Sequence, residues 1–117
     1  MIELLILINL MRTKPLVESK TLDTMAVARA EQIYKSDKFS HDGFGKQWEK
    51  TTCGYVGENL AKDFQDDKST HEAFVASPTH KAVMINPKYK YLGVGKYKNI
   101  TVELFCDKIY DKKIKKI

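Results

Sequence analysis

The most informative stretch of this chain is Phe39-Ser40-His41-Asp42-Gly43, which is followed by Gly57-Glu58-Asn59-Leu60-Ala61 and then by Ser77-Pro78-Thr79-His80. In this order the three segments supply two imidazoles and one carboxylate. Each segment also contains a glycine or a proline, the residues that most strongly control backbone geometry. Two histidines with a carboxylate can hold a divalent cation or move a proton. Because the segments lie far apart along the chain, the residues alone make these three side chains candidates for a site without showing that they meet.

Working outward toward the N-terminus, local patterns predict two helices, over residues 3–12 and 21–34. The first is apolar from Leu4 to Leu10, but it lacks the basic start and the small-residue cleavage site of a signal peptide and is too short to cross a bilayer. In the second, apolar residues recur at helical spacing, with Arg29 and Gln32 at other angles. We expect both helices to pack on a core.

Two further helices have recognisable starts. Ser69-x-x-Glu72 has the form of a capping box that would open a helix over residues 70–76. Ser77 followed by Pro78 is typical of an N-cap with proline at the first helical position, and it predicts a helix that runs to residue 84.

Strands are predicted for residues 53–56, 91–98 and 100–106, the last two as a hairpin. Ile100, Val102, Leu104 and Cys106 alternate with other side chains at the period of a strand. Helices before and between these strands predict an α/β fold, a three-layer α/β/α sandwich with a small, mostly antiparallel central sheet. We expect a single domain over residues 1–107 and a basic C-terminal tail over residues 108–117.

Composition excludes some classes of partner. The chain of 117 residues carries a net charge of +5, which comes from lysine. It has no ribonucleoprotein-type aromatic motif, zinc finger or arginine cluster, so we expect no nucleic-acid partner and read the charge as an aid to solubility. No transmembrane segment is predicted, and a monomer is favoured.

The two cysteines, Cys53 and Cys106, leave two alternatives open. In an oxidising compartment a pair in a small domain suggests one disulfide. Alternatively, both are buried thiols that behave as small apolar residues. A nucleophilic role for Cys53 is not favoured, because nothing in the sequence fixes a histidine beside it.

Seven short motifs together resemble the CAP superfamily (cysteine-rich secretory proteins, antigen 5 and pathogenesis-related 1 proteins) in its compact bacterial form. Besides the three segments above they are Asn9-Leu10-Met11-Arg12, Asn86-Pro87-Lys88-Tyr89, Leu92-Gly93-Val94-Gly95 and Val102-Glu103-Leu104-Phe105. The resemblance covers roughly residues 3–106 and implies the sandwich fold. Because members of this superfamily are mostly exported, it also implies an extracellular or cell-surface location, although this chain shows no signal peptide.

The resemblance further implies a central cavity lined by two histidines and two glutamates that can take zinc. His41 matches the first histidine, Glu58 the first glutamate and His80 the second histidine. Ser77 stands where the second glutamate is expected, so three of the four groups remain as ligands for zinc or another divalent cation.

Each of these residues also has a simpler interpretation. His41 could have no role beyond a hydrogen bond to the backbone of the turn in which it lies, and Glu58 could cap a helix that follows it. His80 lies in the first turn of its predicted helix, where burial and exposure are equally ordinary. We expect His71 to lie on the surface and Asn59 to hold a loop through its amide.

Three functions remain open on this basis. The one favoured is a binding module for a protein, lipid or cell-wall ligand. The alternative is a metal-assisted, peptidase-like hydrolase that uses His41, Glu58 and His80. It is disfavoured because Glu58 would have to serve both as ligand and as general base. The third is a stable scaffold with a relict cavity, since fold alone does not imply function.

Overall fold

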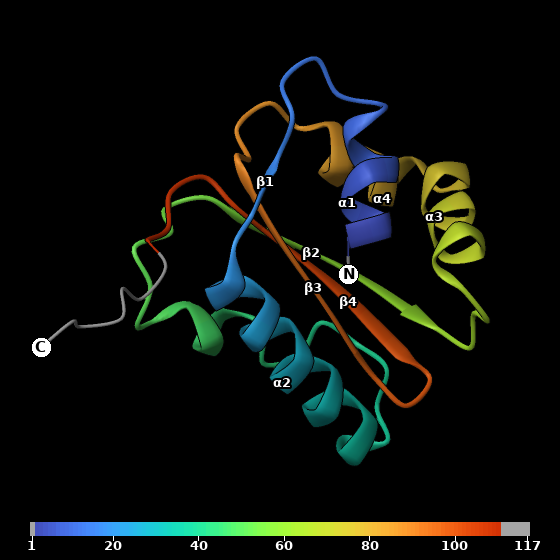
Figure 1. Cartoon of the computed structure of the whole chain (residues 1–117). Helices are drawn as coiled ribbons and strands as arrows, with labels where there is room; N and C mark the ends of the chain where they lie inside the picture. The colour runs from blue at the N-terminus through green and yellow to red at the C-terminus, as the bar shows by residue number, and fades with distance from the viewer. Residues whose placement is uncertain (1, 111–117) are drawn as a thin grey trace, which may run out of the picture.

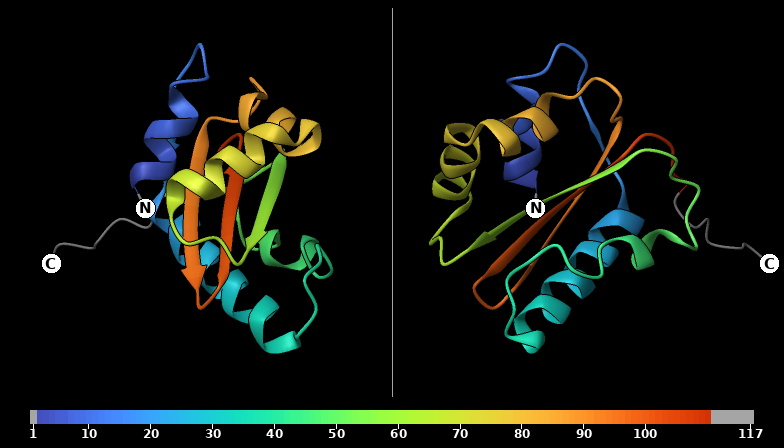
Figure 2. Two further views of the ribbon diagram at one scale, coloured as in Figure 1. Left: turned by 90° about the vertical axis from the view of Figure 1, so that its right-hand side faces the viewer. Right: turned by 180° about the vertical axis from the view of Figure 1, so that it is seen from behind.

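A four-stranded sheet lies between two layers of helices in the computed structural model, which describes residues 2–110 (Figure 1). The elements in chain order are α1 (Ile2–Asn9), β1 (Val17–Glu18), α2 (Lys20–Ser36), the 3-10 turn η1 (Gly45–Trp48), β2 (Val56–Lys62), α3 (Asp67–Ala76), α4 (Pro78–Ile85), β3 (Tyr91–Tyr97) and β4 (Ile100–Cys106). Helix α2 covers one face of the sheet, and α1, α3 and α4 cover the other (Figure 2). The predicted α/β/α sandwich is confirmed.

The strands are ordered β1-β3-β4-β2. Strands β3 and β4 form the predicted hairpin, and β2 runs antiparallel to β4 from Val56, opposite Cys106, to Lys62, opposite Ile100. The short β1 pairs with β3 in parallel and was not predicted, because two residues carry no periodic signal. Strand β2 is therefore an edge strand.

Alternation along β4 separates two cores. Ile100, Val102 and Leu104 pack with the apolar side of α2, whereas Phe105 packs with α1, α3 and α4. All seven residues of β4 are buried, since both faces of the sheet are covered by helices. The polar residue Glu103 thereby becomes fully buried on the α3 and α4 side.

Helix α2 packs directly on the backbone of β3, and two glycines permit this contact. A Cβ atom on Gly93 would lie 2.2 Å from the carbonyl carbon of Leu22, and one on Gly95 would lie 2.2 Å from the backbone nitrogen of Val27. The absence of a side chain at these positions sets the distance between helix and sheet.

Two predicted boundaries are wrong in instructive ways. The capping box that opens α3 joins Asp66 and Ser69, not Ser69 and Glu72: Asp66 accepts a bond from the Ser69 nitrogen at 2.8 Å. Asp66 is the N-cap because its own backbone is extended, and the helix begins one residue later. Ser77 is the N-cap residue of α4 with Pro78 after it, as predicted.

The segment after Cys53 also differs from the prediction. A strand was expected over residues 53–56, but the strand observed here is β2, which begins only at Val56 and runs to Lys62. It includes Glu58 and Asn59, where one of the alternatives was the start of a helix. Pairing with β4 over seven residues decides this conformation. Such pairing is long-range and leaves little trace in the local sequence.

The two cysteines form a disulfide, Cys53–Cys106, which ties the loop before β2 to the end of β4. Arg12 donates hydrogen bonds to the carbonyl oxygens of Met84, Asn86 and Tyr89, and so it holds the end of α1 against the α4–β3 loop. No helix within residues 2–110 is long and apolar enough to cross a membrane. The predicted tail lies mostly outside the described residues, so the domain boundary stays a prediction.

Candidate functional site

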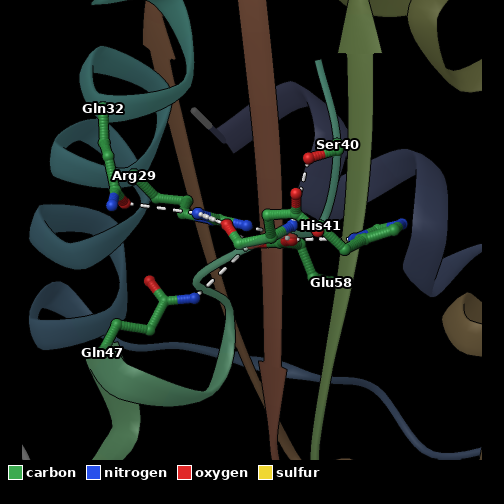
Figure 3. Close-up of polar contacts among 7 residues, drawn as sticks. Arg29, Gln32, Ser40, His41, Gln47 and Glu58 are labelled. Atoms are coloured by element: carbon green, nitrogen blue, oxygen red, sulfur yellow. Dashed lines mark hydrogen bonds and ion pairs between the residues drawn. The ribbon is translucent and has the colours of Figure 1, made fainter. Parts of the chain in front are cut away.

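The carboxylate of Glu58 is the centre of a buried polar network (Figure 3). It lies on the α2 side of β2, and its Oε2 and Oε1 atoms accept bonds from Nε (2.8 Å) and Nη2 (3.1 Å) of Arg29. Both side chains are 1% exposed. This is a bidentate, charge-assisted pair, the strongest geometry available to these two groups.

Arg29 also fixes the loop that carries His41. Its Nη1 donates to the carbonyl oxygen of Asp42 at 2.9 Å and to the side-chain oxygen of Gln32 at 3.2 Å. Gly43 follows with φ of 82°, a conformation that glycine adopts without strain. The loop therefore folds back onto α2 at a fixed position.

His41 completes this network at its exposed edge. Its Nδ1 lies 2.8 Å from Oε1 of Glu58, and its side chain is 60% exposed. A carboxylate behind an imidazole fixes the tautomer and the ring orientation, so the other ring nitrogen is presented in a defined direction. The interpretation of Glu58 as a helix cap is wrong, because a strand and not a helix follows it.

His80 and Ser77 form a second pair, on the other side of β2. His80 Nδ1 lies 2.8 Å from the Ser77 hydroxyl, and its ring stacks on Phe74 at 5.1 Å between centroids. Burial lowers the pKa of His80, and the charge of His41 lowers it further. His80 is therefore a neutral imidazole at pH 7, and it lies close enough to His41 for a charge on that ring to lower its pKa.

Strand β2 connects the two pairs because consecutive side chains point to opposite faces. Glu58 points to Arg29 and His41, whereas Asn59 points to α4 and donates to the carbonyl oxygen of His80 at 3.2 Å. Asn59 is structural as expected, but it acts from a strand and not from a loop. The site thus straddles the edge strand of the sheet.

Two residues of this site were missed in the sequence. The sequence analysis placed Arg29 away from the apolar side of its helix. Arg29 nevertheless lies seven residues after Leu22 and three after Ala26, which are both fully buried. Helical spacing alone would have placed it toward the sheet. Glu103 accepts from the same Asn59 amide at 3.2 Å, and its other oxygen has no partner among the described residues.

Burial raises the pKa of Glu103 to about 8, against a lowering by the Asn59 hydrogen bond. The carboxyl group is therefore protonated at neutral pH, the state that a site without a counterion favours.

The prediction that His71 lies on the surface is wrong. It is 8% exposed and lies on the buried side of α3, next to the buried Thr70. Burial lowers its pKa, and its Nδ1 has no hydrogen-bond partner among the described residues. It is a neutral core residue.

The fit of this arrangement to a metal ion depends on Glu58. Both of its oxygens are engaged by the guanidinium of Arg29, so an ion bound directly to it would have to displace a buried cation. Within residues 2–110 no group of three His, Cys, Asp or Glu side chains is placed to hold a metal ion. In this arrangement Glu58 orients His41 and pairs with Arg29, and metal binding by His41, Glu58 and His80 stays a prediction.

Comparison with known proteins adds a family and a fold. Residues 10–104 match the model of a family described as CAP, the cysteine-rich secretory protein family. A search of curated protein sequences gave no match.

Three solved structures share the fold. One is an extracellular protein of Bacillus anthracis with an SCP domain (24% identity, TM-score 0.87, covering 92% of this chain and 40% of that one). Another is a cysteine-rich secretory protein of Staphylococcus aureus (24% identity, TM-score 0.83, covering 92% and 38%). The third is an outer surface protein of Borrelia burgdorferi (23% identity, TM-score 0.72, covering 89% and 86%). The chain thus spans about two fifths of the length of the first two.

Proposed function

Because the chain belongs to the CAP family, the cysteine-rich secretory proteins, we propose that it is a binding module that works outside the cell or at its surface. The names of the three structural relatives describe extracellular, secretory or outer surface proteins. The disulfide supports the same location, since disulfides persist in oxidising compartments.

One observation carries the choice of binding over catalysis: the bidentate pair between Glu58 and Arg29. A general base must be free to accept a proton from a substrate or a water molecule. The side chain of Glu58 is 1% exposed, and both of its oxygens are bonded to Arg29 or His41. It therefore positions His41 and is not free to act as a base. What remains for contact is a rigid surface that presents His41, with His80 beyond the edge of β2.

The binding proposal is tested with a cell-wall ligand and a lipid surface in parallel. The purified protein is sedimented with isolated peptidoglycan sacculi or with anionic vesicles, beside His41→Ala, His80→Ala and a control, Glu72→Ala on the exposed side of α3. We expect one of the two surfaces to retain the protein and the two histidine variants to lose retention, with circular dichroism unchanged. Retention of all variants alike would overturn the assignment of this surface.

The zinc site expected from the family stays a prediction and has its own measurement. Zinc is titrated calorimetrically into the metal-free protein and into His41→Ala and His80→Ala. Saturable binding lost in both variants would establish that the two imidazoles hold the ion with Glu58 behind His41. Heat that neither substitution changes would remove the metal from this surface.

The hydrolase alternative requires Glu58 to leave Arg29 during turnover. It predicts that Glu58→Gln abolishes cleavage of a peptide or ester while the fold survives. The binding proposal predicts no turnover for the unchanged protein, so detection of turnover that this substitution removes would favour the enzyme.

A further inference from the structure

A hollow of about 290 Å³ lies at the C-terminal end of α2, and neither His41 nor His80 lines it. The end of α2, the end of β2 and the β3–β4 connection meet there, over a floor of the buried Ile33 and Ile100. Its volume is close to the lower limit of small-molecule pockets, about 300 Å³, so it is suited to a ligand of one ring.

The frame of this hollow is unusually fixed. The non-glycine residues with positive φ among residues 2–110 are Asp37, Asp63 and Lys98, and each lies in or next to one of the three segments. Asp63 and Asn99 also tie two of the segments together, through Asp63 N to Asn99 O at 2.9 Å and Asn99 Nδ2 to Asp63 Oδ1 at 2.6 Å. Asp37 is the left-handed C-cap of α2 and Lys98 lies in the tight β3–β4 turn, so these positions fix where the three segments end.

The walls combine aromatic rings with polar groups. Tyr34 and Phe39 are both 44% exposed, and Tyr34 is held in place by an edge contact with Tyr97 at 5.5 Å between centroids. Half-exposed rings from the end of α2 and from the loop after it offer flat apolar surface at little entropic cost.

Amines and an amide complete the lining. The Nζ atom of Lys38 forms an ion pair with Oδ2 of Asp42 at 2.7 Å, whereas Lys62 has no ion pair among the described residues. Lys62 is therefore the amine available to an anion. Asn99, Tyr34 and Asp37 also line the hollow and add polar groups to its rim, although the Asn99 amide already donates to Asp63.

We propose that this hollow binds a single sugar ring that carries a carboxylate, a hexuronic acid. The C–H faces of the sugar stack on Tyr34 and Phe39, the hydroxyl groups bond to the polar rim, and the carboxylate pairs with Lys62. A planar aromatic acid would leave the polar rim unpaired, which costs free energy in a pocket. This site is separate from the surface of His41 and goes beyond the proposed function.

The test compares two sugars that differ at one carbon. D-glucuronate and D-glucose are titrated into the isotopically labelled full chain, and amide shifts are followed by NMR, with the Asn99 side chain as a reporter. We expect saturable shifts with glucuronate at a Kd of about 1 mM, and binding of glucose about fivefold weaker or more.

The variants include a matched control, since Phe64 is also 44% exposed but does not line the hollow. We expect Phe39→Ala to weaken glucuronate binding about tenfold, Phe64→Ala to leave it unchanged, and Lys62→Gln to reduce it to the level of glucose. Absence of saturable shifts, equal affinity for the two sugars, or equal losses in the two phenylalanine variants would each overturn the proposal.

Discussion

Replacing Glu103 by glutamine tests whether the raised pKa of this buried carboxyl group makes the stability of the protein depend on pH. Glu103 is 0% exposed, with one oxygen bonded to Asn59 and the other unpartnered among the described residues. Burial raises its pKa to about 8 from the ordinary value of 4.5, and the carboxylate of Asp67 adds to the rise. Between these two values the folded chain holds a proton that the unfolded chain releases.

The sign of the effect follows from this difference in proton binding. Since the folded state binds more protons, the free energy of unfolding falls as pH rises from 4.5 to 8. Each pH unit inside this window costs about 1.4 kcal/mol, which gives about 3 kcal/mol between pH 4 and pH 7. Glutamine has no proton to lose, so E103Q avoids this loss.

The assay is urea unfolding followed by circular dichroism at pH 4, 5.5 and 7, on the unchanged protein and E103Q. The stability of E103Q relative to the unchanged protein should increase by about 3 kcal/mol from pH 4 to pH 7, at constant m-value. Any fixed cost of the buried amide, about 1–3 kcal/mol, cancels because it is the same at every pH.

A matched control is Glu72→Gln, which makes the same replacement at an exposed position on α3. A difference between E103Q and the unchanged protein that stays constant from pH 4 to pH 7 would refute the reasoning.

Three further predictions concern stability. Reduction of the disulfide, which closes a loop of 53 residues, should lower the free energy of unfolding by about 4 kcal/mol, seen as a lower urea midpoint with reductant than without. Arg29→Met should cost about 3–5 kcal/mol because it leaves Glu58 buried without a counterion, and the double variant with Glu58→Met should recover much of this loss in a double-mutant cycle. If the losses simply add, the pair is not coupled as described. Gly95→Ala should cost about 3 kcal/mol by pushing α2 off the sheet, whereas Gly45→Ala, where a Cβ meets no atom within 4 Å, should leave the thermal midpoint unchanged.

The arrangement of helices and strands was largely predictable because its signals are local. Alternation from Ile100 to Cys106 marks a strand, and Ser77-Pro78 marks a helix start, since each depends on residues a few positions apart. The family motifs gave the sandwich for the same reason: they are short segments whose order in the chain is itself the signal. The motifs also named His41 and Glu58 as candidate site residues, but the hydrogen bond between them was not predicted.

Other features depended on contacts that no local pattern encodes. Strand β2 exists because β4 pairs with it over seven residues, so Glu58 and Asn59 point to opposite faces instead of starting a helix. His71 is buried because α3 packs against its neighbours with that side inward, and local spacing did not show which side that would be.

The sequence by itself determined the family, the layers of the fold and some of the candidate site residues, His41, Glu58 and His80. Only the tertiary structure decided their electrostatic roles. Arg29 neutralises Glu58 from a position 29 residues away, while Glu103 receives no counterion and keeps its proton. A carboxyl group is charged or neutral according to the groups that folding places beside it, and these lie far from it along the chain.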